Sequence, residues 1–126
     1  MKTFDKLVMF SMAVSDMVKV KDFYAGKLGF KITTDYRQDD NNWWVSLELP
    51  GGGTSLTLTT VHENMKPGTM KLYLSTPDIE EAYKQLSEND VGLTDEIHDD
   101  LYGPGSGIKW FSFHDPDGNH WIILQP

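Results

Sequence analysis

The sequence predicts an α+β fold: two βαβββ modules in tandem, whose strands form a curved mixed sheet around a cavity. The predicted order of elements, β-α-β-β-β, occurs twice, and the pairs Val14-Ser15 and Leu74-Ser75 hold matching places in the two halves. A spacing of about 60 residues indicates duplication of one supersecondary unit. Such a unit carries a helix on only one face of its sheet, so the other face must be buried or line a cavity. We therefore expect one domain over residues 1–126, with modules at 1–62 and 70–126.

The first module opens with an apolar strand over 7–14, followed by a helix. Ser15 or Asp16 can cap this helix, because either side chain can accept a hydrogen bond from a backbone N–H of the first turn. Gly29 is placed to end the helix in the left-handed conformation. The apolar stripe at helical spacing comprises Met17, Val20, Phe23, Tyr24 and Leu28.

The rest of the first module is predicted to be extended. A strand covers 30–36, and the polar run 37–42 is interpreted as a loop. Strands over 43–50 and 54–61 are joined by a glycine-rich hairpin.

The second module repeats this order. A strand over 71–75 precedes a helix in which Thr76 is the predicted cap and Pro77 the first residue. A weaker strand is expected over 93–97. The last two strands, 108–114 and 120–125, flank the sequence DPDGN. The buried stripe of this helix comprises Ile79, Ala82, Tyr83 and Leu86.

Composition narrows the classes of partner. The net charge of −8 disfavours nucleic acid, which needs a basic surface, and also anionic membranes. The absence of cysteine excludes disulfides and thiolate metal sites. No apolar run is long enough for a membrane span or a signal peptide, so a cytoplasmic location is the default expectation.

The stretch HDPDGNHW, residues 114 to 121, could be a metal site or a tight turn. The turn is favoured, because Pro presets φ, Asp can bond its own backbone and Gly tolerates positive φ. If Asp115 to Gly118 form the loop, His114 pairs with Asn119 and Phe113 with His120. Because side chains alternate faces along a strand, the two histidines would then not converge on one ion.

Strand alternation also predicts which side chains face the cavity. Of the adjacent tryptophans, Trp44 is chosen as the ligand-stacking residue, and Trp110 is expected to face away from the cavity. Apolar walls with a few polar groups suit a small organic ligand. The predicted ligand-binding residues are Met9, Ser11, Trp44, Thr57, Lys71, Tyr73, Phe111, Phe113, His120 and Ile122.

Lys71 is open to two interpretations. Inside the cavity it would pair with a ligand carboxylate or phenolate, or act as a base if desolvated. At the strand end its ammonium group would instead extend to water. Lys71, His120 and Tyr73 are the candidate acid–base groups if the protein is an enzyme.

Several motifs make the chain resemble the vicinal oxygen chelate superfamily, which includes glyoxalase I, bleomycin-resistance proteins and extradiol dioxygenases. These motifs are VSDMVKVKDFYAGKLGF, GGGTSLTL, STPDIEEAYKQL and YGPGSGIKWFSFHDPDGNHWIIL. The resemblance covers almost the whole chain and implies the tandem βαβββ fold. It says little about the reaction, because one scaffold hosts unrelated functions in this superfamily.

The resemblance also implies where a metal would be held. In metal-dependent members, His, Gln or Glu ligands come from strand positions that correspond here to Met9, Thr57, Lys71 and Ile122. Three of these side chains are a thioether, an ammonium group and a hydrocarbon, none of them an ordinary ligand for a hard metal. We therefore expect no metal site and no cofactor.

Three functional hypotheses follow. The first is a binding protein that sequesters or carries a small organic or aromatic compound, as metal-free resistance proteins of this superfamily do. The alternative is an enzyme of lyase, isomerase or dioxygenase type, working with no metal or with an atypical site. A third is a regulatory module that binds a metabolite without chemistry. The resemblance also implies a homodimer.

Overall fold

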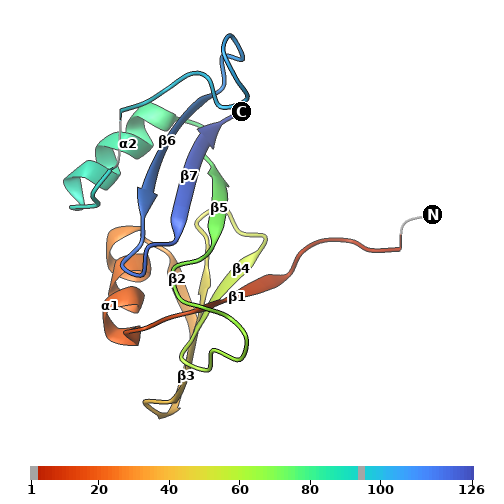
Figure 1. Cartoon of the computed structure of the whole chain (residues 1–126), viewed down its shortest axis with the longest axis vertical. Helices are drawn as coiled ribbons and strands as arrows, with labels where there is room; N and C mark the ends of the chain where they lie inside the picture. The colour runs from red at the N-terminus through yellow and green to blue at the C-terminus, as the bar shows by residue number, and fades with distance from the viewer. Residues whose placement is uncertain (1–2, 94–95) are drawn as a thin grey trace. The chain divides into compact units, whose positions relative to one another are not determined.

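The computed structural model describes residues 3–93 and 96–126, and the chain divides into two compact units, Met1–Pro67 and Gly68–Pro126. Each unit has one helical segment against a sheet that combines parallel and antiparallel strands (Figure 1). The predicted α+β class and tandem arrangement are confirmed. The strands form two open sheets, of four and three strands, where a single curved sheet was expected. The prediction that both modules make up a single domain stays a prediction.

Unit 1 contains the four-stranded sheet, in the order β1-β4-β3-β2. β1 and β4 are parallel, and the other pairs are antiparallel. Its elements are β1 (Met9–Ala13), α1 (Met17–Asp22), the π-helical turn η1 (Phe23–Lys27), β2 (Lys31–Asp39), β3 (Asn42–Glu48) and β4 (Ser55–Thr59).

Local signals explain where the helical segment begins and ends. Of the two candidate caps, Asp16 accepts a hydrogen bond from the backbone N–H of Lys19 at 3.2 Å. At the other end Gly29 has φ of +75°, as predicted for a residue that ends a helix. The N–H of Phe30 then donates to the carbonyl of Tyr24 at 3.0 Å. This turn directs the chain from the helix into β2.

The core of unit 1 lies between the helical segment and one face of the sheet. Met12, Leu56 and Leu58 are almost completely buried there. The hydroxyl of Tyr24, itself fully buried, donates to Sδ of Met12 at 3.6 Å. The opposite face of the sheet lacks this helical cover and is called the open face of unit 1.

The predicted polar loop over 37–42 is wrong. β2 runs to Asp39, because Arg37 pairs with Trp43 and Asp39 with Asn42 in the antiparallel ladder. The turn is thereby reduced to the residues between Asp39 and Asn42. Polar side chains marked this segment as a loop, although they belong to an exposed strand.

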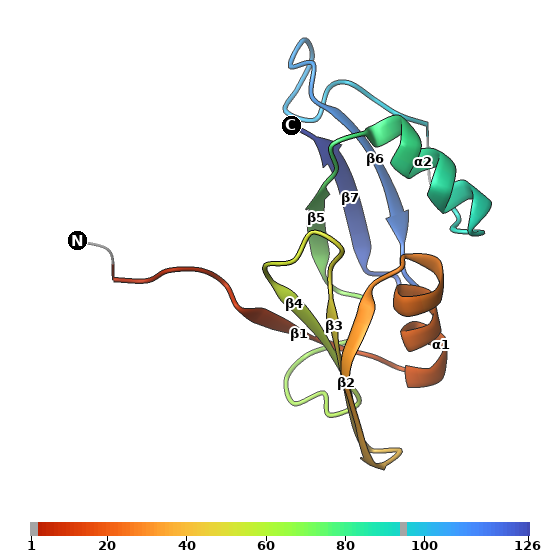
Figure 2. The same cartoon turned by 180° about the vertical axis from the view of Figure 1, so that it is seen from behind.

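Unit 2 contains the three-stranded sheet, in the order β5-β7-β6. Its elements are β5 (Lys71–Ser75), α2 (Ile79–Glu88), β6 (Lys109–His114) and β7 (His120–Gln125). α2 packs along β6 and β7 on one side of the sheet (Figure 2). The helix begins later than predicted: Asp78 is the cap and accepts from the N–H of Glu81 at 3.1 Å.

The predicted strand over 93–97 includes Thr94 and Asp95, which lie outside the described residues. On either side of them the described chain pairs with β6 at isolated bridges and forms no named strand. Leu93 pairs with Phe113, and His98 pairs with Trp110.

The DPDGN segment is a turn, but it is one residue longer than predicted. The N–H of Asp115 donates to the carbonyl of Asn119 at 3.0 Å, which closes the loop over five residues. His114 consequently pairs with His120, and Phe113 with Trp121. A shift of one residue moves every following side chain of one strand to the other face relative to its partner.

None of the described helices is long and apolar enough to cross a membrane.

Candidate functional site

The open face of unit 1 carries an aromatic platform. Trp44 and Tyr36 lie opposite each other on β3 and β2, with ring centroids 5.7 Å apart and planes inclined by 29°. The two side chains are 38% and 52% exposed. Adjacent Trp43 is on the other face and only 7% exposed. The two tryptophans face opposite sides, as strand alternation predicted, and Trp44, which was chosen as the ligand-stacking residue, lies on the open face.

Hydroxyl groups lie beside this platform. Oγ of Ser46 and Oγ1 of Thr57 are 2.9 Å apart, and the Thr57 hydroxyl also contacts Sδ of Met9 at 3.7 Å. Ser11 pairs with Thr57 in the β1–β4 ladder and shares its face. Met9, Ser11, Trp44 and Thr57 therefore lie on one face, whereas their role in ligand binding stays a prediction.

The family's metal positions in unit 1 do not suit a metal. The Thr57 hydroxyl is engaged with Ser46, and its nearest sulfur partner is the soft thioether of Met9. Among residues 3–93 and 96–126, no group of three or more His, Cys, Asp or Glu side chains is arranged to hold a metal ion. In unit 2, Ile122 has no donor atom. The expectation of no metal site and no cofactor stays a prediction.

The open face of unit 2 brings together four predicted site residues. The parallel β5–β7 ladder pairs Lys71 with His120 and Tyr73 with Ile122. Nζ of Lys71 lies 5.9 Å from the centroid of the Tyr73 ring, which is 55% exposed. Lys71 is exposed at the start of its strand, in agreement with the interpretation that its ammonium group reaches water.

The prediction that His114 and His120 point to opposite faces is wrong. Their rings stack with centroids 4.6 Å apart and planes inclined by 9°. Burial of His120 lowers its pKa, and the positive charges of His114 and Lys71 lower it further. The five-residue turn is the physical cause of this correction, because it aligns the two histidines across the β6–β7 ladder.

The predicted cavity-facing positions of Phe111 and Phe113 are also wrong. Both are completely buried, and Phe111 contacts Tyr83 of α2 with ring centroids 5.2 Å apart. They face the helix and build the core of unit 2. Trp110, expected to face away from the cavity, lies instead on the open face, opposite Leu124.

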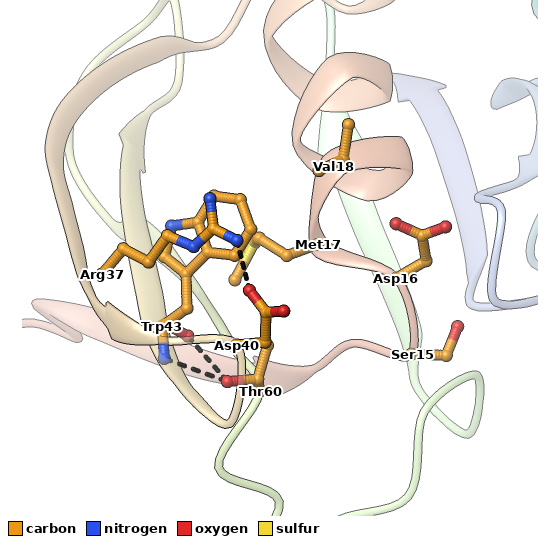
Figure 3. A pocket seen from close by; sticks show the side chains of 8 residues that line it. All are labelled: Ser15, Asp16, Met17, Val18, Arg37, Asp40, Trp43 and Thr60. Carbon is orange, nitrogen blue, oxygen red and sulfur yellow. Dashed lines mark hydrogen bonds and ion pairs between the residues drawn. The ribbon is translucent and has the colours of Figure 1, made fainter.

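A separate hollow lies on the helix side of unit 1, with a volume of about 340 Å³ (Figure 3). The Arg37 guanidinium stacks 4.3 Å from the centroid of the Trp43 ring and pairs with Asp40. Because Arg37 already has these two partners, the hollow is less suited to an aromatic ligand than the open face is. The lining comprises Ser15, Asp16, Met17, Val18, Arg37, Asp40, Trp43 and Thr60.

Trp43, which forms one wall of this hollow, is held rigidly. Its indole N–H donates to Asp35 at 2.7 Å, and Nζ of Lys21 pairs with the same carboxylate at 2.7 Å. The hydrogen bond from Lys21, followed by that from Trp43, lowers the pKa of Asp35. The Asp35 carboxylate thus connects β2 to both the helix and β3.

Sequence reasoning missed Tyr36 and Ser46, because β2 was expected to end at Tyr36 and its pairing with β3 was unknown. It also missed His114, through the register error. Alternation along β3 would have placed Ser46 beside Trp44 on one face. No sequence pattern predicted the hollow beside Arg37, since the hollow forms only because β2 continues past residue 36.

Comparison with known proteins supports the fold described above. The family model of the Glyoxalase/Bleomycin resistance protein/Dioxygenase superfamily matches residues 6–123. No curated protein matches the chain.

Solved structures cover nearly the whole chain. TnmS3, an antibiotic binding protein from Streptomyces sp. CB03234, is 31% identical over 98% of each chain, with a TM-score of 0.80. A superfamily member from Sphaerobacter thermophilus DSM 20745 is 30% identical over 98% of each chain, also with a TM-score of 0.80. A glyoxalase/bleomycin resistance protein from Streptomyces sp. CB03234 is 31% identical, covers 95% of this chain and 100% of its own, and has a TM-score of 0.76. The chain therefore belongs to the glyoxalase/bleomycin resistance protein/dioxygenase superfamily.

Proposed function

We propose that this protein binds a small planar organic compound on the open face of unit 1 and holds it without changing it chemically. The observation that carries the proposal is the exposed stack of Tyr36 and Trp44. Large aromatic rings are usually covered by other side chains, and an exposed pair offers a flat surface for a further ring.

The surroundings of the platform support the same class of ligand. Ser11, which is exposed on the same face, can orient polar substituents of the compound through its hydroxyl. The hydroxyls of Ser46 and Thr57 are buried and bonded to each other. The polarisable thioether of Met9 adds an adaptable apolar contact. A mainly apolar surface with a few fixed polar groups is typical of small-molecule sites.

A relative provides independent support. TnmS3 is described as an antibiotic binding protein, and it is 31% identical to this chain over almost its full length. For this chain we propose that the compound is an antibiotic with a planar aromatic ring system.

The Trp44→Ala variant tests this function. A thermal-shift screen against planar polycyclic aromatics identifies a ligand, and calorimetry measures its affinity. Because ring stacking contributes about 0.5–1.5 kcal/mol beyond area burial, we expect Trp44→Ala to weaken binding roughly ten-fold. Trp44→Phe keeps a ring and should retain most of the affinity.

Tyr102→Ala is the matched control, since it removes another aromatic ring that is 76% exposed, but from unit 2. Affinity should not change in this variant. Equal affinities of Trp44→Ala and the unmodified protein would show that the platform is not the binding surface.

The enzyme alternative predicts a different fate for the bound compound. Lys71, His120 and Tyr73 are the groups that could transfer protons, and they share the open face of unit 2. Mass spectrometry of the ligand after prolonged incubation separates the hypotheses. Recovery of the unchanged compound supports a binding protein, and product formation that depends on Lys71 or His120 supports an enzyme.

A cytoplasmic location stays a prediction. We also propose that the protein is a homodimer. Phe4, Leu7 and Val8 precede β1, an edge strand of its sheet, and they are 62% to 88% exposed. Exposed apolar residues beside a sheet edge favour pairing with a second chain. Light scattering should give a mass near twice 14.3 kDa, and a Phe4→Ser/Leu7→Ser variant should approach the monomer mass. A monomeric unmodified protein would contradict this proposal.

A further inference from the structure

Three basic side chains form a row across the sheet of unit 2. Lys71 of β5 is paired with His120 of β7, and His120 is paired with His114 of β6. Because paired residues share a face, all three lie on the side of the sheet opposite to Phe111 and α2. The two imidazole rings are stacked, with centroids 4.6 Å apart.

Protonation of the imidazoles in this row is electrostatically unfavourable without an anion. Burial lowers the pKa of His120, and the charges of His114 and Lys71 lower it further. Within residues 3–93 and 96–126, none of the three side chains forms an ion pair with a carboxylate. The neighbouring carboxylate of Asp115 accepts three hydrogen bonds from its own turn. An external anion would relieve the repulsion between these groups.

The surroundings of the row indicate what kind of anion it accepts. The ring of Tyr73, which is 55% exposed, lies 5.9 Å from Nζ of Lys71. An inorganic ion gains nothing from contact with this ring, whereas an organic acid can place its hydrocarbon part against it. A carboxylate also suits a row of N–H donors that includes a lysine ammonium group.

We propose that Lys71, His120 and His114 bind the carboxylate of a small organic acid, with the Tyr73 ring against its apolar part. This inference rests on unit 2 alone and does not depend on the proposed function of the aromatic platform. Because the bound carboxylate favours the charged imidazole, binding is coupled to proton uptake by His120. Affinity therefore increases as the pH falls from about 8 toward 6, where carboxylic acids are still ionised.

Histidine NMR with two isosteric probes tests the site. Benzoate and benzamide are titrated into the full chain at pH 6.5, and the imidazole C–H resonances are followed. His114→Gln and His120→Gln variants assign the signals. We expect benzoate to shift the resonances of both histidines with saturation and to raise the pKa of His120. Benzamide, which has no charge, should have little effect.

Variants of two lysines supply the matched comparison. Lys71→Met should weaken benzoate binding roughly ten-fold, because a charge-assisted hydrogen bond is lost. Lys109→Met removes an exposed lysine at the far end of β6, opposite Gln125, and should leave the affinity unchanged. Backbone amide spectra confirm that both variants are folded.

Three results would overturn the proposal. Equal shifts with benzoate and benzamide would mean that only the ring is recognised. Tighter binding of inorganic phosphate than of benzoate would exclude the organic acid. Unchanged benzoate affinity in Lys71→Met would exclude the row as the site, whatever the outcome for the aromatic platform in unit 1.

Discussion

Replacing Gly68 with alanine is expected to lower the free energy of unfolding by roughly 2 to 5 kcal/mol. Gly68 has φ of +82°, and a methyl group there would overlap the backbone carbonyl of Asp117 in the turn between β6 and β7. In this variant the alanine must adopt the left-handed conformation, which is unfavourable for it, and the backbone must also move away from the turn. Urea unfolding of the purified variant measures the loss.

Gly105→Ala separates these two contributions. Gly105 has nearly the same φ, +83°, but a Cβ atom there would meet no atom within 4 Å. Only the conformational cost, about 1 to 2 kcal/mol, should appear in this variant. Equal losses in the two variants would show that the contact between Gly68 and the turn has no energetic importance.

Replacing Asp115 with alanine is expected to lower the free energy of unfolding by roughly 3 to 5 kcal/mol. Its carboxylate, which is 5% exposed, accepts from the N–H of Asp117 at 3.0 Å. It also accepts from the backbone N–H and side-chain Nδ2 of Asn119, at 2.9 and 2.8 Å. Removal leaves up to three donors unsatisfied in a buried turn, and each costs about 1 to 3 kcal/mol.

Thermal and urea unfolding measure this effect, with the exposed Asp99→Ala in the same unit as a control that should change stability by less than about 0.5 kcal/mol. A double-mutant cycle with Asn119→Ala tests the mechanism. Because both residues belong to one hydrogen-bond network, their effects should not be additive. Additive losses would mean that Asp115 acts independently of Asn119.

The elements that the sequence predicted well are those with strong local signals. Asp16 and Gly29 delimit the first helical segment through a cap and a left-handed residue, both of which depend on neighbours a few positions away. Alternation grouped Met9 with Ser11 and Thr57 with Thr59, and the structure places these residues on one face together with Trp44.

The register of the last hairpin could not be predicted in the same way. Asn119 belongs to the turn because its side chain accepts from the N–H of Met70, 49 positions earlier in the sequence. No local pattern contains that contact, and the turn chemistry of DPDG suggests a shorter loop. The single extra residue moved Phe111, Phe113 and Trp110 to the opposite faces and brought His114 beside His120.

Only one of the two residues of the aromatic platform was predicted, for a related reason. Trp44 was assigned to the open face, but Tyr36 stood at the expected end of its strand and had no partner in the prediction. Pairing between β2 and β3 beyond Tyr36 completes the stack. Strand ends defined by polar residues are unreliable when the strand is exposed on both faces, as β2 is.

The strand order β5-β7-β6 has a consequence for synthesis of the chain on the ribosome. β5 emerges first, yet its ladder partner His120 follows Lys71 by 49 positions, which corresponds to about 2 to 10 s of translation. During this interval the edge of β5 and the apolar face of α2 have no central strand to pack against. Unit 2 therefore depends on completion of β7 before it can fold, whereas the strands of unit 1 are all available by residue 59.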